Sequence, residues 1–241
     1  MANNMNIEKE MSNYINPLYE DNHIIAAVKP PNIPTQGDIT GDVSFFENVK
    51  DYIKIKYNKK GNVFLGLVHR LDRPVSGVIV FAKTSKAASR LSEAIRDRKF
   101  EKNYYAVVNG ILLEKEGKLE NYLIKKTNKL GNIAQVVFEN TKNAKIAKLK
   151  YNVIKEDIIK NLSLLKIELE TGRFHQIRVQ LANIGHAIYG DRKYGSYIKY
   201  DRNDVPLALF AKSLKFPHPT KDEEIHVEAD LPLNNPWNIF N

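Results

Sequence analysis

The sequence predicts a protein of the α+β class with a mixed, mainly antiparallel sheet. Four segments between residues 104 and 169 alternate apolar and polar side chains with a period of two, which is typical of half-buried strands. Strands come in runs and do not alternate regularly with helices. No internal repeat or Gly/Ser-rich or Pro-rich linker interrupts the 241 residues. We therefore expect one domain over residues 18–241, after a loose tail over residues 1–17.

Three helices are predicted from their end signals. Residues 44–57 begin with a capping box, because Ser44 and Glu47 can each bond the backbone amide of the other. Ser85 is the expected N-cap of a second helix over residues 86–98. A third helix is expected over residues 174–184, since Gly185 just past its end is a typical C-terminal signal. The apolar face of the second helix is predicted to consist of Ala88, Leu91 and Ile95.

Strands are predicted before, between and after these helices along the chain. They are 23–28, 63–68, 77–82, 104–108, 133–138, 147–153, 165–169, 207–214 and 225–228. Lys29-Pro30-Pro31 ends the first of them, and residues 217–222 are expected to form a turn. Trp237 and Phe240 are expected to pack the last segment of the chain.

The net charge of +9 favours an anionic partner, and nucleic acid is the first candidate. The alternative is a basic composition with no ligand, since A+T-rich coding also yields chains rich in Lys, Asn and Ile. Lys is the default cation of this chain, yet Arg clusters in two short segments. Clustered Arg indicates that the planar guanidinium is needed there.

Missing residue types exclude several kinds of site. The chain has no cysteine, so disulfides, cysteine–zinc sites, iron–sulfur clusters and a cysteine nucleophile are excluded. Glycine-rich nucleotide loops, zinc-type histidine pairs and a G-x-S-x-G elbow are also missing. We expect no cofactor and no metal. No apolar run reaches the roughly 18 residues of a membrane span, and no signal peptide is evident, so a cytoplasmic location without membrane contact is expected.

Asp72 is the first candidate functional residue. It lies between Arg70 and Arg73, and apolar strands flank this segment on both sides. A fixed, ionised carboxylate in a basic cleft can act as nucleophile or base on an anionic polymer. The alternative is an Asp that caps a turn and pairs with a neighbouring Arg, which is a common arrangement.

The second candidate segment spans residues 170–186. On a helix, His175 and Arg178 would share one face and Ile177 another, so one side packs while Arg178 points into a site. Backbone amides near Arg173 at the helix N-terminus can bind phosphate. The alternative is an amphipathic surface helix with solvated Arg side chains.

Together these segments resemble the RluA-type pseudouridine synthases. The motifs are H-R-L-D-R-x-x-S-G-V at 69–78, G-R-x-H-Q-I-R-V at 172–179 and G-D-x-x-Y-G at 190–195. Shorter matches at 19–23, 29–31, 102–106 and 210–219 extend the resemblance to about residues 18–240. The chain departs from the family pattern at Val75, Phe174 and Gln180. None of these is a residue with an expected chemical role.

The resemblance implies a single catalytic domain with a central basic cleft, no S4-like RNA-binding domain, and isomerisation of uridine in rRNA or tRNA without cofactor or metal. Asp72 would be the catalytic carboxylate and Arg178 its ionic partner. Tyr104 would stack on the flipped base and assist proton transfer at C5. Arg70 would fill the space that the base leaves. The further RNA or pocket contacts would be Arg73, Arg173, Lys212 and Leu214. His69 and His175 are expected to be structural.

RNA is the expected partner, and a monomer is the default expectation. A non-catalytic RNA-binding or ribosome-assembly factor with the same fold is one alternative. A glycosidase acting on acidic glycans is another, and it would need a second carboxylate about 5–10 Å from Asp72.

Overall fold

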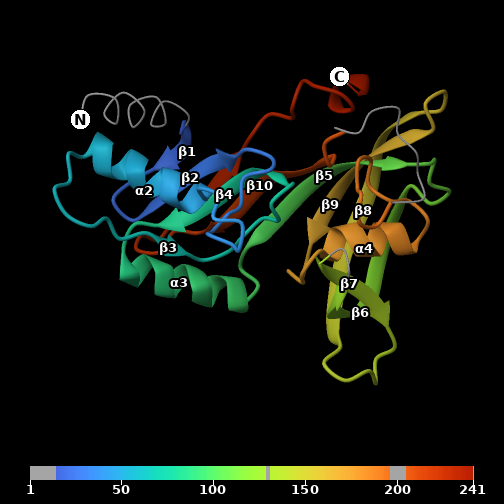
Figure 1. The fold of residues 1–241 in the computed structure, drawn as a ribbon, viewed down its shortest axis with the longest axis horizontal. Coiled ribbons are helices and arrows are strands. Elements are labelled where there is room, and N and C mark those ends of the chain that lie inside the picture. The colour runs from blue at the N-terminus through green and yellow to red at the C-terminus, as the bar shows by residue number, and fades with distance from the viewer. Residues whose placement is uncertain (1–14, 129–130, 196–204, 241) are drawn as a thin grey trace. The chain divides into compact units, whose positions relative to one another are not determined.

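The computed structural model describes residues 15–128, 131–195 and 205–240, and the chain divides into two compact units (Figure 1). The first unit comprises Met1–Phe100 and Ser213–Ala229, and the second comprises Glu101–Lys212 and Asp230–Asn241. Each unit is therefore built from two separate stretches of chain, which explains why no linker is visible in the sequence. The predicted tail over residues 1–17 lies mostly outside the described residues, but Ile15 is buried.

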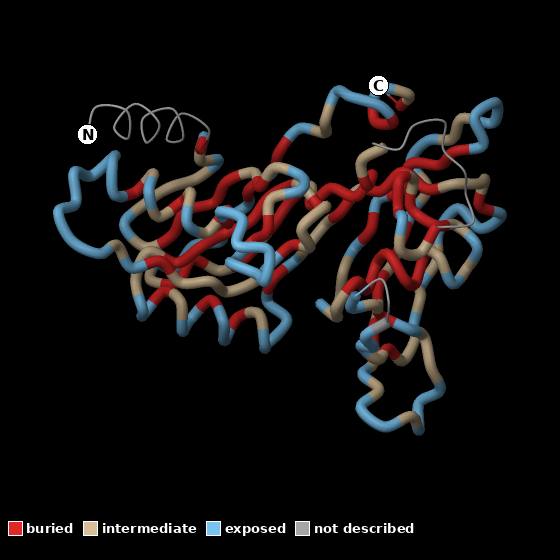
Figure 2. The backbone as a smooth tube through the Cα atoms, in the orientation of Figure 1, coloured by how far each residue is buried: buried red, intermediate tan, exposed pale blue. Residues whose placement is uncertain are grey.

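The first unit contains a sheet whose central strands are almost fully buried (Figure 2). β2 pairs antiparallel with both β1 and β4, and Ile25 lies opposite Phe81. Burial at nearly every position explains why β2 and β4 read as continuous apolar runs. The strands are β1 (Pro17–Glu20), β2 (Ile24–Lys29), β3 (Gly66–Leu67), β4 (Ser76–Ala82), β11 (Glu224–Glu228) and the end of β10 (Leu209–Pro217).

Two helices complete the first unit. The capping box predicted at Ser44 and Glu47 is confirmed at the start of α2 (Phe45–Lys56). The cap predicted for α3 (Ser85–Arg96) was wrong by one residue, because the Thr84 hydroxyl accepts the Ala87 N–H and Ser85 is already helical. The buried face of α3 is accordingly rotated from the predicted one and consists of Ala87, Leu91 and Ala94. α3 packs on β3 and β4.

The second unit contains an antiparallel sheet in the order β5-β9-β8-β6-β7. Its strands are β5 (Glu101–Asn109), β6 (Glu116–Asn128), β7 (Gly131–Val137), β8 (Lys145–Asp157) and β9 (Leu162–Leu169). Four of these five were predicted as strands, and β6 was not. The predicted α+β class is confirmed.

The helix α4 (Gln176–Asn183) contacts β6 and β7 (Figure 1). It begins two residues later than predicted, because His175 has a left-handed φ of 51°. Gly185 follows its end with a φ of +86°, as the sequence indicated. Every residue from 176 to 181 is buried, so the prediction of one packed and one open helix face was wrong. Near the end of the chain, Trp237 and Phe240 are buried as predicted.

Candidate active site

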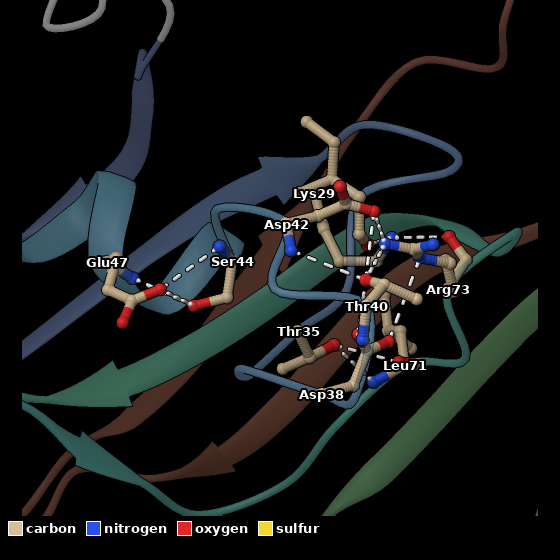
Figure 3. Close-up of polar contacts among 10 residues, drawn as sticks. Lys29, Thr35, Asp38, Thr40, Asp42, Ser44, Glu47, Leu71 and Arg73 are labelled. Carbon is tan, nitrogen blue, oxygen red and sulfur yellow. Dashed lines mark hydrogen bonds and ion pairs between the residues drawn. The ribbon is translucent and has the colours of Figure 1, made fainter.

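Asp72 lies in the short connection between β3 and β4 of the first unit. On one side the Thr35 hydroxyl donates to the Leu71 carbonyl at 2.8 Å and accepts the Leu71 N–H at 3.2 Å (Figure 3). On the other side the N–H of the buried Val75 donates to the Asp72 carbonyl at 3.0 Å. The backbone of Asp72 is thus fixed on both sides, while its side chain is only half-buried.

A buried lysine supports the same turn. The Lys29 side chain is 0% exposed, and its Nζ donates to the carbonyl oxygens of Pro30, Ile33 and Arg73 at 2.7, 2.8 and 3.1 Å. Burial lowers the pKa of Lys29 to about 7, although the carboxylate of Asp72 opposes that shift. Three acceptors match the three N–H donors of an ammonium group. Lys29 therefore links the loop after β2 to the turn that carries Asp72.

The lowered pKa of Lys29 predicts a pH-dependent contribution to stability. Between pH 7 and pH 10.5 the unfolded chain retains a proton that folded Lys29 has released, so the free energy of unfolding rises with pH in that window. Lys29→Met removes this group. The difference in unfolding free energy between wild type and Lys29→Met is expected to grow by about 2 kcal/mol from pH 7 to pH 9. Urea unfolding at both pH values measures it, and parallel pH profiles would contradict it.

Arg73 is held by an acidic loop of its own chain. Its Nη2 donates to the Thr40 hydroxyl at 3.1 Å and to the Asp42 carboxylate, and its Nε lies 3.9 Å from Asp38 Oδ2 (Figure 3). These carboxylates are largely exposed. Exposed ion pairs of this kind contribute only about 0–1 kcal/mol to stability, so they hold the Arg73 side chain only weakly on this loop.

The other predicted residues of the first unit differ in exposure. Arg70 is exposed, whereas Leu214 in β10 is 1% exposed and lies opposite Val227 of β11. His69 Nε2 accepts the Val80 N–H at 3.1 Å, which supports the structural role expected for this histidine.

In the second unit, Arg178 and Asp191 form a buried bidentate ion pair. Arg178 Nε and Nη2 donate to the two Asp191 carboxylate oxygens at 2.7 and 2.8 Å, and the two side chains are 5% and 0% exposed. Asp191 Oδ1 also accepts the backbone N–H groups of Lys193 and Tyr194. This pair uses two of the five guanidinium N–H groups, so Arg178 can also donate to other acceptors.

Tyr194 and His175 extend this network. The Arg178 guanidinium lies 5.2 Å from the centre of the Tyr194 ring. The Tyr194 hydroxyl accepts the Ala134 N–H at 2.6 Å and contacts His175 Nδ1 at 2.8 Å. Burial, helped by the charge of Arg178 and two nearby lysines, lowers the pKa of His175 to about 3. The Tyr194 hydroxyl can thus donate a hydrogen bond to the neutral His175 Nδ1, which fits a structural role.

The remaining predicted residues of the second unit are Tyr104, Arg173 and Lys212. Tyr104 in β5 is 8% exposed and opposite Ile167, and Lys212 in β10 is half-buried. Arg173 Nε donates to the Ile146 carbonyl at 2.9 Å. The backbone N–H of Arg173 donates to Gln176 Oε1 at 3.0 Å, so the amide expected to bind phosphate already has an acceptor within the chain.

Within residues 15–128, 131–195 and 205–240, no group of three or more His, Cys, Asp or Glu side chains is arranged to hold a metal ion. No helix in those ranges is long and apolar enough to cross a membrane.

The family model of RNA pseudouridylate synthases matches residues 23–183, well over half of the chain. The chain belongs to this family. An uncharacterized RNA pseudouridine synthase of Bacillus subtilis is 34% identical over 90% of the chain and 68% of that protein. A protein of Buchnera aphidicola subsp. Schizaphis graminum named ribosomal large subunit pseudouridine synthase C is 33% identical over 90% of the chain and 67% of its own length.

Solved structures agree on the fold of this pseudouridine synthase. Human RNA pseudouridylate synthase domain containing 4 superposes with a TM-score of 0.77 at 23% identity, covering 94% of this chain and 91% of that one. The RluA-type resemblance seen in the sequence is confirmed by the family model and the relatives. Members of this family are isomerases that act on RNA.

Sequence reasoning assigned no role to three residues of this pseudouridine synthase: Lys29, Asp191 and Tyr194. A signal existed for the last two, since both lie in the G-D-x-x-Y-G motif, where the spacing suits an Asp that caps the following turn. Lys29 precedes Pro30-Pro31 and follows a fully apolar run, so its burial could be suspected, but its carbonyl partners could not.

Proposed function

We propose that this protein converts specific uridines in RNA into pseudouridine, with Asp72 as the catalytic carboxylate. The observation that carries the proposal is the turn around Asp72, which is fixed by Leu71 and Val75 yet leaves the carboxylate partly accessible. Positioning of this kind is what a nucleophile or general base requires, because its geometry must be set before substrate binds.

The reaction breaks the bond between N1 of uracil and C1′ of the ribose and forms a bond between C5 and C1′. C5 loses its proton to solvent, and N1, which carries no proton in uridine, gains one, so the atoms balance and no oxidant or reductant is consumed. Asp72 has two possible roles in this scheme. It either attacks C1′ to form a glycosyl ester or removes a proton from the sugar.

The proposed roles of the other residues follow the family resemblance. A uridine within folded RNA must leave its stack, at a cost of a few kcal/mol, and Arg70 would fill the space behind it. Tyr104 would stack on the flipped uracil, and Arg178 would keep Asp72 ionised. Arg73, Arg173, Lys212 and Leu214 remain proposed RNA or pocket contacts. Arg73 would have to exchange its carboxylate partners for phosphate.

Ribosomal RNA is the first substrate class to test. The named relatives of Buchnera and Rickettsia are called large ribosomal subunit enzymes, which favours rRNA over tRNA for this chain. The net charge of +9 suits either polymer. The glycosidase alternative receives no support from the family to which the chain belongs.

Release of tritium from C5-labelled uridine tests the proposed function. Purified protein is incubated separately with bulk rRNA and bulk tRNA, both from a strain that lacks the gene, and heat-inactivated protein is the control. Release from rRNA is expected. Release from tRNA alone would keep the reaction and overturn the substrate class. Tight binding to RNA without release from either pool would favour the non-catalytic binding factor.

A further inference from the structure

Phe174 presents an aromatic ring on a rigid support just before α4. The ring is partly buried and stacks on His175, with 3.8 Å between ring centres and 19° between ring planes. His175 is itself buried and held by the Tyr194 hydroxyl at 2.8 Å. The ring of Phe174 is therefore backed by a side chain that has little room to move.

A lysine ammonium group also lies over this ring. The Lys125 Nζ of β6 lies 5.0 Å from the centre of the Phe174 ring. Because His175 stacks nearly parallel on one face at 3.8 Å, no base fits on that face, and a base has to stack on the opposite one. Lys125 is exposed and has a long flexible stem, so it can leave the ring when a better partner arrives.

The surroundings of the ring are positively charged. Besides burial, the charges of Arg178, Lys193 and Lys125 lower the pKa of the neighbouring His175. Arg178 is buried and balanced by Asp191, so exposed Lys125 and half-buried Lys193 are the cations that can reach a phosphate. A planar aromatic face beside accessible lysines is an arrangement by which proteins bind unpaired nucleotides, since bases stack on the ring and phosphates pair with the cations.

We propose that Phe174 is a stacking platform for an unpaired base of the RNA substrate, and that Lys125 moves from the ring to an adjacent phosphate when the base stacks. The proposal rests on the proposed function only in taking RNA as the ligand. It does not assign a sequence, because every base has a face that can stack.

A purely structural role for Phe174 makes a different prediction. The ring also packs against the small buried cluster of Leu123, Ala134, Ala147 and Val179. If packing were its only role, an apolar side chain of similar size would replace it without affecting RNA binding. Substitutions at Phe174 separate the two roles.

Binding of a short labelled oligouridylate and of an abasic ribose-phosphate oligomer of equal length provides the test. Phe174→Leu keeps apolar volume but removes the aromatic face, and it is expected to bind oligouridylate about 5- to 100-fold more weakly. Its affinity for the abasic oligomer is expected to stay at the wild-type level. Phe174→Tyr should retain wild-type binding of both. Phe138→Leu is the matched control, since Phe138 is 86% exposed elsewhere in the second unit.

Equal weakening of both oligomers by Phe174→Leu, or no weakening of either, would overturn the proposal. If Phe174→Leu does not fold, Phe174→Trp supplies a fluorescent platform. Its added emission should be quenched by oligouridylate and not by the abasic oligomer, and absence of this difference would overturn the proposal. These measurements need no turnover. Failure of tritium release would therefore count against the proposed function, whereas the binding measurements would still test the stacking proposal.

Discussion

Replacement of Asp72 by Asn is expected to abolish tritium release from RNA while leaving RNA affinity nearly unchanged. The substitution keeps the size of the side chain and does not touch the backbone bonds that fix the turn. An amide can neither attack C1′ nor accept a proton from the sugar. Loss of a general base lowers rate by about 10²- to 10⁴-fold, and loss of a nucleophile by more.

Asp51→Asn is a matched control for this experiment. Asp51 is also an aspartate of the first unit, but it is exposed on α2. It should retain wild-type release and wild-type affinity. Residual release by Asp72→Asn within about tenfold of wild type would remove Asp72 from the proposed catalytic role. A parallel loss of RNA affinity would show that the substitution disturbs binding and not the chemical step alone.

Removal of the Asp191 carboxylate is expected to destabilise the protein by about 3–5 kcal/mol. Arg178 is 5% exposed, so Asp191→Ala leaves a buried guanidinium without the carboxylate that balances its charge. It also removes the acceptor of two backbone N–H groups at Lys193 and Tyr194. Asp191→Asn should cost less, because its side-chain oxygen can still accept those bonds.

Urea unfolding of a double-mutant cycle measures the coupling in this pair. Arg178→Met and Asp191→Asn are each expected to destabilise, while the double variant should be more stable than the sum of the two losses indicates. The expected coupling is about 1–3 kcal/mol. Additivity within about 0.5 kcal/mol would mean that the two side chains contribute independently, contrary to their bidentate geometry.

The sequence predicted helix ends best where they depend on hydrogen bonds between residues that are close in the chain. The capping box at Ser44 and Glu47 and the glycine after α4 involve bonds across a few residues, and both were predicted correctly. The start of α4 was not, because a left-handed His175 is stabilised by the distant Tyr194. Nothing in the local sequence around His175 carries that information.

The strand β6 shows a second limit. It pairs with β7 along one edge and with β8 along the other, and most of its side chains are exposed or half-buried. Its alternation of apolar residues is therefore weak. Gly117 within it allows the Tyr151 ring to approach so closely that a Cβ would lie 2.7 Å from a ring carbon. Sheet pairing and this contact are tertiary, so propensity alone does not reveal them.

For the candidate site, motif resemblance indicated Asp72 and Arg178, whereas their immediate surroundings required the structure. Arg178 was expected to point from an open helix face, yet it is buried against Asp191. The residues that hold it are 13 or more positions away in the chain. Arg178 and Asp191 can both be read from the sequence motifs, but the distance between them depends on how β6, β7 and α4 pack.

The assembly of each unit from two stretches of chain has a consequence for synthesis on the ribosome. The side of β4 that pairs with β10 stays unmatched until Ser213–Pro217 has been made, more than 100 residues later. The second unit likewise lacks Trp237, which packs on Phe210, until the last residues emerge. Neither unit can finish folding before residues beyond Lys212 have been made. Until then the apolar edge of β4 stays unpaired, and such an edge favours chaperone binding and misassociation.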